Sequence, residues 1–331
     1  LSASASSDYP FEDFDENALA TTFYTSGTTG NPKGVCFSHR QLVLHTLAAK
    51  GPFGASPAAP CLGVDDVYKP LTPMFHVHAW GLPYVATALG VKQVYPGRYE
   101  AKMVCDLRSA HGVSYSHCVP TILSMVLAAA DETGADLSNW KMTIGGAALS
   151  KALYAESRNH GMNVGAGYGM SETCPFISNA AVRSRDGARD DDMEAATLTA
   201  SGFPVPLVSA KIVDDAMNEL PRDGVSRCEL VLRSPWLTPC YVGNEEASDA
   251  LWRGGWLHTQ DIATIDPQGR IRIRDRLKDI IKTGGEWIDS IQLEELVASA
   301  PGVKEASVIA APDDKWGERP LAVVVPADGF T

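Results

Sequence analysis

The run of ten residues from Thr25 to Gly34 consists almost wholly of hydroxyl side chains, glycines and one lysine. Glycine lets backbone N–H groups turn inward at angles that a Cβ atom would block, Ser and Thr add donors, and Lys33 adds a mobile positive charge. Such a combination predicts a cradle for phosphate groups, and a nucleotide polyphosphate is the ligand that fits it. A flexible surface loop is the alternative, because the same residue types dominate such loops.

The spacing within this run excludes the common P-loop of kinases and GTPases, which requires G-x-x-x-x-G-K-[ST]. Counting from Gly27 puts Pro32 at the position of the second glycine. It also puts Gly34 where a Mg²⁺-binding hydroxyl must stand. The chemistry of a phosphate loop is therefore present without the Walker pattern.

Three further segments carry side chains suited to nucleotide chemistry, and they span residues 168–173, 255–261 and 275–288. The first (YGMSET) offers an aromatic ring, a hydroxyl and a carboxylate, and a hard carboxylate oxygen suits Mg²⁺. The second (GWLHTQD) ends in an acceptor-only carboxylate. The third (DRLKDIIKTGGEWI) combines basic residues with a Gly-Gly pair. Taken singly, the first could be a turn with a surface glutamate, and the third a basic amphipathic hairpin.

Two other segments complete the set. Gly145 to Ala148 follows an apolar run, and Pro73 to Gly81 (PMFHVHAWG) gathers aromatic and histidine side chains. The His76-x-His78 pair could suggest a zinc site on a strand. Since no third ligand stands at a recognisable spacing, we do not expect these two histidines to bind zinc.

In their order along the chain, these segments resemble the motifs of the AMP-forming acyl-CoA synthetases, members of the adenylate-forming superfamily. The resemblance extends from Thr25 to Trp287. It implies that a substrate carboxylate attacks the α-phosphorus of ATP, giving an acyl-adenylate, and that the thiol of CoA then releases AMP. ATP, Mg²⁺ and CoA are the cofactors and co-substrates that it implies. A carrier-protein thiol or oxygen as the acceptor, and a nucleotide-binding protein without turnover, remain alternatives.

The resemblance also assigns roles to individual residues. Catalysis would involve Lys33, His76, Ser171 and Glu172, with Glu172 holding Mg²⁺. Binding of ATP and CoA would involve Thr25, Ser26, Gly27, Thr28, Thr29, Gly30, Gly146, Ala147, Ala148, Gly167, Tyr168, Gly169, Met170, Asp261, Ile273, Arg276, Gly284, Gly285 and Trp287. The acyl group would contact His76, Val77, Trp80, Gly146 and Gly167.

Within these motifs, some roles are specific. Asp261 would accept hydrogen bonds from the ribose, and Gln260 before it departs from the usual glycine. Lys278 falls on the hinge position, and Gly284 with Gly285 would let pantetheine pass close to the backbone.

The substrate is a small carboxylic acid. Trp80 beside His76 suggests a pocket partly filled by an indole, and hence a short or medium chain. Residues 73–99 look similar to bacterial medium-chain ligases, including those that activate 3-methylmercaptopropionate. A core role for Trp80 stays open, because burial is the commoner fate of tryptophan.

Composition narrows the class of protein further. The net charge of the 331 residues is −12, so no overall basic field favours nucleic acid or an anionic membrane. No apolar run approaches the ~20 residues that span a bilayer. Seven scattered cysteines without a C-x-x-C pair favour reduced thiols and a cytoplasmic location. A homodimer is left open.

Short apolar runs alternate with helical stretches up to about residue 200, which predicts a layered α/β sheet. One of these helical stretches is expected from Thr121 to Ala130. We expect residues 1–200 to form a large α/β domain, and 201–275 a small antiparallel β subdomain of it. Residues 276–331 would begin a mobile α+β C-terminal domain. A helix starting near Ser38 is expected to bring its N-terminus to the phosphates.

Both ends of the sequence suggest a fragment. Leu1 is not a methionine, and the resemblance implies a C-terminal adenylation lysine, in a P-x-x-x-x-G-K pattern, beyond Thr331. On that basis we expect the given polypeptide to adenylate poorly.

Overall fold

Parallel strands form the largest sheet in the computed structural model, which describes residues 8, 10, 12–25, 31–55, 60–182, 190–298, 300–327 and 329–330. Within that part the strands are ordered β4-β3-β5-β6-β7-β8-β9. Their bounds are β3 Val67–Pro70, β4 Lys92–Gln93, β5 Tyr115–Cys118, β6 Lys141–Ile144, β7 Asn163–Gly169, β8 Phe176–Asn179 and β9 Phe203–Pro204. Strands β3 to β7 pair in parallel, whereas β8 and β9 run antiparallel. The predicted layered α/β sheet is confirmed.

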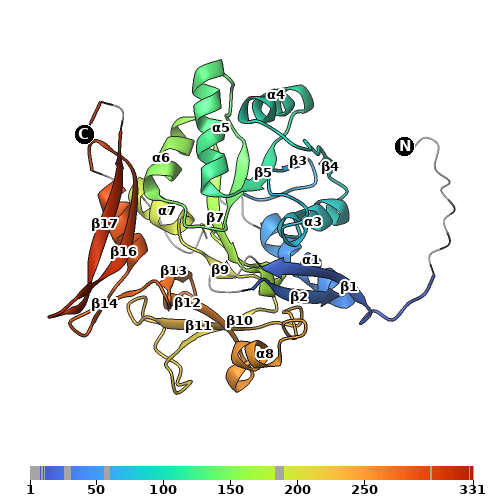
Figure 1. The fold of residues 1–331 in the computed structure, drawn as a ribbon. Coiled ribbons are helices and arrows are strands. Elements are labelled where there is room, and N and C mark those ends of the chain that lie inside the picture. Colours follow the sequence, from blue (N-terminus) through green and yellow to red (C-terminus); the bar gives the residue numbers. More distant parts are fainter. Residues whose placement is uncertain are drawn as a thin grey trace.

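Helices connect the parallel strands and cover both faces of this sheet (Figure 1). Their bounds are α1 His39–Ala55, α2 Val77–Trp80, α3 Leu82–Leu89, α4 Ala101–His111, α5 Pro120–Thr133, α6 Lys151–Asn159 and α7 Asp191–Leu198. Helix α5 shows the local logic: Pro120 begins it with a preset φ, and Gly134 ends it in the left-handed conformation. The helix expected from Thr121 to Ala130 is therefore present.

A two-stranded hairpin carries the glycine-rich loop. Strand β1 (Leu19–Thr25) pairs antiparallel with β2 (Lys33–Ser38), and Thr25 lies opposite Lys33 at the loop end. Helix α1 begins at the other end, where the His39 N–H donates to the Ala18 carbonyl at 3.2 Å. The expectation of a helix N-terminus beside the phosphates is therefore wrong, because β2 leads the chain away from the loop before α1 starts.

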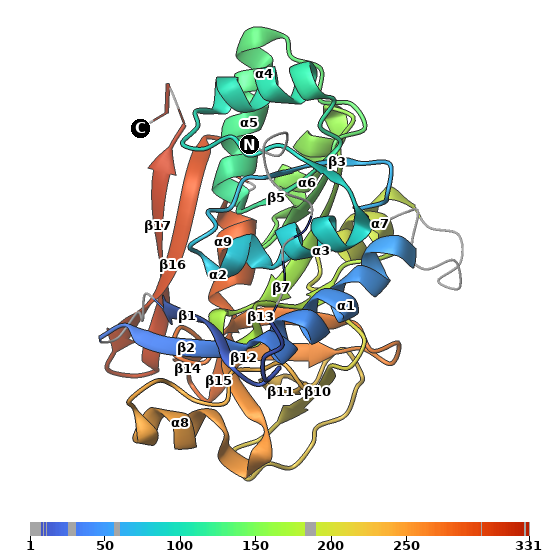
Figure 2. The ribbon, with the colours of Figure 1, turned by 90° about the vertical axis from the view of Figure 1, so that its right-hand side faces the viewer.

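Two further sheets are antiparallel. The first has the order β10-β11-β12-β13 and the second β15-β14-β17-β16. Their strands are β10 Ser209–Val213, β11 Cys228–Arg233, β12 Leu257–Ile265, β13 Ile271–Arg276, β14 Ile281–Thr283, β15 Glu286–Ile288, β16 Val303–Asp313 and β17 Gly317–Pro326. Helix α8 (Glu245–Leu251) precedes β12, and α9 (Ser290–Ala298) lies between β15 and β16. In Figures 1 and 2 the hairpin β1–β2 lies between the large sheet and the first antiparallel sheet.

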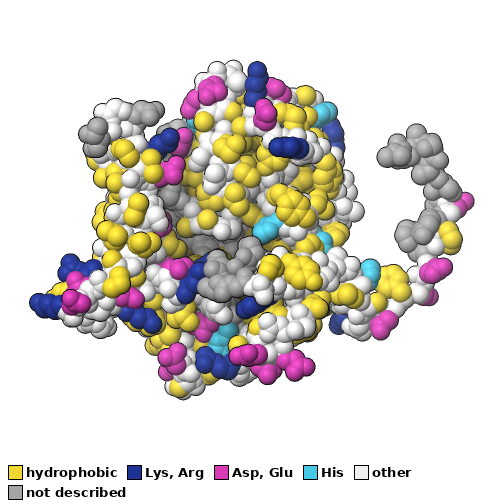
Figure 3. Space-filling view, in the orientation of Figure 1, with side chains coloured by type: hydrophobic (Ala, Val, Ile, Leu, Met, Phe, Trp, Pro, Cys, Tyr) yellow, Lys and Arg dark blue, Asp and Glu magenta, His cyan; other side chains and the backbone are white. Residues whose placement is uncertain are grey.

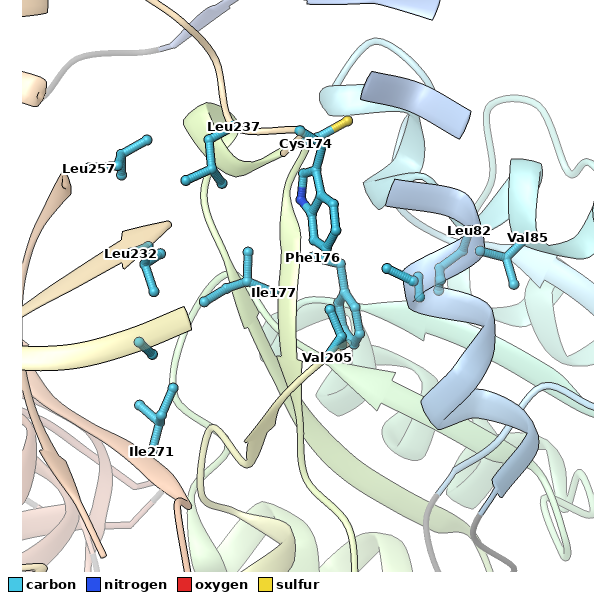
Figure 4. Close-up of a cluster of buried hydrophobic side chains, with 14 of the residues drawn as sticks. Leu82, Val85, Cys174, Phe176, Ile177, Val205, Leu232, Leu237, Leu257 and Ile271 are labelled. Atoms are coloured by element: carbon cyan, nitrogen blue, oxygen red, sulfur yellow. The ribbon is translucent and has the colours of Figure 1, made fainter. Parts of the chain in front are cut away.

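One buried cluster joins the large sheet to the first antiparallel sheet. Phe176 and Ile177 of β8 stand between Leu82 of α3 and the sheet residues Leu232 and Leu257 (Figure 4). A second cluster lies among α4, α5, α6 and the parallel strands. Because burial of apolar side chains is the main driving force of folding, the first cluster fixes the antiparallel sheet against the large sheet.

The β16–β17 ribbon stands along one side of the molecule and exposes apolar side chains (Figure 3). Ile309 is 50% exposed, and Leu321, Val323, Val324 and Val325 are 46–54% exposed. Among the described residues, no helix has the length and apolar character to cross a membrane.

Candidate active site

The carboxyl ends of β6 and β7 gather the residues predicted for the nucleotide. Gly146, Ala147 and Ala148 follow β6 and are exposed, and residues 167–170 end β7 half-buried. Gly169 is required here, because a Cβ atom would lie 1.9 Å from the Pro175 carbonyl oxygen. In sheets of this kind, ligands bind at the carboxyl ends of the strands.

A short 3₁₀ turn, Ser171–Thr173, follows β7 and presents Glu172. The Glu172 side chain is nearly buried, and its Oε1 accepts a hydrogen bond of 2.6 Å from the Tyr241 hydroxyl. Lys33 Nζ lies 4.8 Å from the centroid of the same Tyr241 ring. The predicted phosphate lysine and the predicted metal carboxylate therefore meet around one tyrosine. Ser26, Gly27, Thr28, Thr29 and Gly30, also predicted for this site, fall outside the described residues.

The predicted ribose residues converge on Asp261. Its Oδ2 accepts a hydrogen bond of 2.5 Å from the Tyr168 hydroxyl, and Arg276 Nε lies 3.9 Å from Oδ1. Burial raises the pKa of Asp261, while the Tyr168 hydroxyl and Arg276 act in the opposite direction. Burial and the Asp261 charge raise the pKa of Tyr168 well above its usual value, so its hydroxyl stays a donor.

Gln260, where a glycine was expected, adopts a left-handed backbone with φ of 59°. It is exposed, and its N–H donates to Glu229 Oε1 at 3.0 Å, while its carbonyl accepts from the Leu277 N–H at 2.8 Å. The pairing of β12 with β11 shifts register between His258 and Ile262, and its pairing with β13 shifts between Ile262 and Ala263. Gln260 thus lies in a bulge of β12 directly before Asp261.

The predicted acyl residues lie on an unusual turn. Val77, His78, Ala79 and Trp80 all have left-handed backbone, with φ between 46° and 60°. Such a run is costly for non-glycine residues, and strain of this kind clusters at functional sites. Val77 and Trp80 are buried, whereas His76 is exposed.

Trp80 fills the space beside the ends of β5 and β6. A Cβ atom built on Gly145 would lie 3.2 Å from its indole, and the His117 ring lies 5.0 Å from it, centroid to centroid. Because the Trp80 ring touches the segment that ends in Gly146, the indole borders the predicted acyl pocket. Its 6% exposure also makes it part of the packed interior.

Three buried histidines lie in or beside this turn, and the sequence analysis considered only His78 among them, as half of a zinc pair. Burial lowers the pKa of His45 and of His78 to about 4, and that of His117 to about 3. They are therefore neutral near pH 7. Among the described residues, no three His, Cys, Asp or Glu side chains converge as a metal site, which leaves the zinc alternative for His76 and His78 without support.

The remaining predicted residues lie in the second antiparallel sheet and in the turn that leads into it. Gly284 and Gly285 form the β14–β15 turn, with φ of 57° and 88°. Positive φ at both positions is what a two-residue hairpin turn requires, so the turn itself explains the glycine pair. Trp287 lies in β15, where its carbonyl accepts a bond from Arg227. Lys278 stands in the turn between β13 and β14.

One predicted residue, Ile273, and one residue that was not predicted, Tyr241, remain to be placed. Ile273 lies in β13, where its N–H donates to the Ser201 hydroxyl. Tyr241 was missed entirely, since no motif contains it. The only sequence signal was a tyrosine between Cys240 and Gly243, which is too common a context to single out.

Family comparisons match almost the whole chain. The family described as AMP-binding enzyme matches residues 2–242, and its C-terminal domain matches residues 292–331. A long-chain-fatty-acid–CoA ligase of Thermus thermophilus is 43% identical over 314 residues, which cover 94% of this chain and 57% of that protein. A 3-methylmercaptopropionyl-CoA ligase of Ruegeria lacuscaerulensis is 39% identical, covering 97% and 59%. A medium-chain-fatty-acid–CoA ligase of Ectopseudomonas oleovorans is 38% identical, covering 96% and 57%.

Solved structures agree with these matches. ATP-bound MatB from Rhodopseudomonas palustris is similar with a TM-score of 0.81 at 27% identity, covering 100% of this chain and 62% of that one. The o-succinylbenzoate CoA synthetase of Bacillus subtilis, in complex with its acyl-adenylate, gives 0.79 at 27%, covering 96% and 61%. The amide bond synthetase McbA of Marinactinospora thermotolerans gives 0.80 at 27%, covering 97% and 62%. The chain thus spans less than two thirds of each of these proteins.

Proposed function

The chain belongs to the family of AMP-binding enzymes, and from that premise we propose that it is part of an AMP-forming acid:CoA ligase. The observation that carries the proposal is the meeting of Lys33 and Glu172 around Tyr241, beside the Tyr168–Asp261 pair. A cation and a carboxylate suited to a polyphosphate thereby lie near a carboxylate suited to a ribose. Relatives that are CoA ligases, at 38–43% identity, support the same reaction.

In the first step the substrate carboxylate forms a bond to the α-phosphorus of ATP, and the bond to pyrophosphate breaks. We assign to Lys33 and Ser171 the neutralisation of the phosphate charge that develops, which is positioning and electrostatic work. Asp261 would orient the ribose, with Arg276 beside it. In the second step the CoA sulfur attacks the acyl carbon and AMP leaves.

The residues around Glu172 fit a Mg²⁺ ion. A carboxylate and the neighbouring Ser171 hydroxyl are hard oxygen donors, and only Glu172 Oε1 is engaged by Tyr241. Since the described residues contain no group of three acidic or imidazole ligands, the remaining ligands would be phosphate oxygens and water. When bound, the ion would neutralise phosphate charge and orient the triphosphate.

For the substrate we propose a short- or medium-chain acid, with a thioether acid among the candidates. The enclosed position of Trp80 against Gly145 and His117 supports a short pocket. The relatives are named for long-chain, medium-chain and 3-methylmercaptopropionyl substrates. An amine in place of CoA is the alternative acceptor, favoured by the likeness to an amide bond synthetase.

The domain division at residues 200 and 275, with the hinge at Lys278, is part of the proposal. It is supported by the separate antiparallel sheets and by the second family match, which begins at residue 292. We further propose a cytoplasmic location, which the seven free thiols support. Light scattering of the purified protein would decide between a monomer and the homodimer.

The test is acyl-CoA formation across acids from acetate to palmitate, with 3-methylmercaptopropionate included. The full-length protein, of which this chain is a part, is incubated with ATP, Mg²⁺ and CoA, and the thioesters and AMP are quantified by chromatography. We expect the rate of thioester formation to be highest with short- and medium-chain acids, and no thioester to form without CoA. Replacing CoA with an amine tests the alternative acceptor. Release of AMP that does not depend on the acid would contradict the proposal, and so would a Glu172→Gln variant that forms thioesters as fast as the wild type.

A further inference from the structure

Tyr241 contacts both predicted phosphate-site residues and belongs to none of the segments singled out in the sequence. Its side chain is 8% exposed. Its hydroxyl donates to Glu172 Oε1 at 2.6 Å, and its ring face lies 4.8 Å from Lys33 Nζ. One side chain thus offers a hydrogen bond to the carboxylate and a π face to the ammonium group.

The backbone around Tyr241 is fixed on both sides. Its N–H donates to the Ser248 hydroxyl of α8 at 2.9 Å, and its carbonyl accepts from the Asn244 N–H at 3.2 Å. On the other side it forms an antiparallel bridge with Val35 of β2. The next residue, Val242, donates to the Gly34 carbonyl at 2.8 Å. The ring is therefore held against the strand that leaves the glycine-rich loop.

Thr238, three residues earlier, extends the same connection to the turn that carries the carboxylate. Its N–H donates to the Glu172 carbonyl at 2.9 Å. Its hydroxyl lies 3.2 Å from the Cys36 carbonyl of β2. The segment 238–242 consequently links the loop hairpin to Glu172 through its backbone as well as through the Tyr241 side chain.

The chemistry of the phenol suits a fixed donor. A phenol is a hydrogen-bond donor that carries its own proton, and the Tyr241 hydroxyl donates to Glu172 Oε1 at 2.6 Å. Its hydrogen bond to Oε1 fixes the rotation of the carboxylate and leaves the other oxygen for a ligand. Groups that orient a metal ligand in this way are usually needed for full metal affinity.

We propose that Tyr241 is a positioning residue that couples Lys33 of the glycine-rich loop to the metal-binding carboxylate of Glu172. The loop and the Mg²⁺ ion would then take up the triphosphate as one unit. The inference rests on the proposed function, in which Glu172 holds Mg²⁺ and Lys33 contacts phosphate. Tyr241 itself touches neither the substrate acid nor the reacting phosphorus.

The test is calorimetric binding of ATP with and without Mg²⁺, and of AMP, to the wild type and to Tyr241→Phe. Phenylalanine keeps the ring beside Lys33 and removes only the donor to Glu172. We expect the gain in ATP affinity on adding Mg²⁺ to fall by about 10-fold, the lower end of the effect of losing an orienting partner. ATP without Mg²⁺, and AMP, should bind as in the wild type.

Tyr154→Phe is the matched control, since the buried Tyr154 hydroxyl also donates to a glutamate, Glu194, at 3.2 Å on the α6–α7 side. It should leave all three affinities unchanged. Tyr241→Leu removes the ring as well, and it should weaken ATP binding even without Mg²⁺. A thermal melt of each variant shows that it is folded.

Glu172→Gln separates the two levels of the argument. If Glu172→Gln abolishes the gain from Mg²⁺ and Tyr241→Phe keeps it, the inference about Tyr241 is wrong and the metal assignment stands. If both variants keep the gain, the metal assignment itself fails, and the inference with it. In the double variant, Tyr241→Phe should add no further loss, because its effect passes through Glu172.

Discussion

Lys69 is fully buried in β3, and no carboxylate of the described residues pairs with it, which predicts an unusual pH dependence of stability. Its Nζ donates to the Val104 carbonyl at 2.5 Å and lies 5.2 Å from the centroid of the Trp140 ring. Burial lowers the pKa of Lys69 to about 8, whereas an unfolded chain holds the proton to above pH 10. Between these values the unfolded state binds more protons, so the free energy of unfolding rises with pH.

The size of the effect follows from that difference in pKa. For an unfolded pKa near 10.5 and a folded pKa of about 8, Lys69 costs about 3 kcal/mol at pH 7. About 1 kcal/mol of that cost is left at pH 10. Methionine has a similar shape and no charge, so Lys69→Met should be the more stable protein at pH 7. Its advantage should shrink by about 2 kcal/mol by pH 10.

Urea unfolding of both proteins from pH 7 to pH 10 measures this advantage, since tyrosines and cysteines titrate alike in the two. Lys92→Met is the control, because the exposed Lys92 also lies near a backbone carbonyl, that of His111. Its difference from the wild type should not change with pH. A Lys69→Met protein whose advantage is independent of pH would refute the buried, destabilised charge.

Three other changes give distinct results. Trp80→Leu should shift the ratio of kcat/KM for a longer acid to that for a shorter one by about fourfold per added methylene, because each buried CH₂ is worth ~0.8 kcal/mol. The control Trp140→Leu should leave this ratio unchanged, and an unchanged ratio in Trp80→Leu would make Trp80 a core residue only. Gln260→Gly should raise the free energy of unfolding in urea by about 0.5–1 kcal/mol, because glycine relieves the strain of the left-handed backbone. The β-branched Gln260→Val should lower it, and the reverse order of stability would contradict the bulge. Lys278→Pro in the full-length protein fixes φ at the proposed hinge and should reduce thioester formation while AMP binding persists. Normal thioester formation would contradict the hinge.

The sequence predicted candidate residues whose signal is local. Glu172 and Asp261 stand in short motifs, and the structure places Glu172 in the turn after β7 and Asp261 in β12. Tyr241 could not be predicted, because its importance comes from contacts with Glu172 and Lys33 that only the folded chain brings about. Pairing between distant segments leaves no mark in a single sequence.

One local expectation was wrong, and one motif has a second physical explanation. The helix start at Ser38 was placed well, but the six residues of β2 before it form a strand, and pairing with β1 decided the direction of the chain. At Gly284 and Gly285 the hairpin turn already demands positive φ, so the glycines carry less information about pantetheine than their motif implies. The left-handed run Val77–Trp80 has no sequence signal, since no glycine lies within it.

The central claim, that a carboxylate is activated by attack on the α-phosphorus, has one direct test. Octanoate labelled with ¹⁸O in its carboxylate is incubated with the full-length protein, ATP, Mg²⁺ and CoA, and the masses of the products are measured by mass spectrometry. Attack on the α-phosphorus predicts that one labelled oxygen appears in AMP and none in pyrophosphate. Label in inorganic phosphate together with ADP, or unlabelled AMP accompanying octanoyl-CoA, would contradict it.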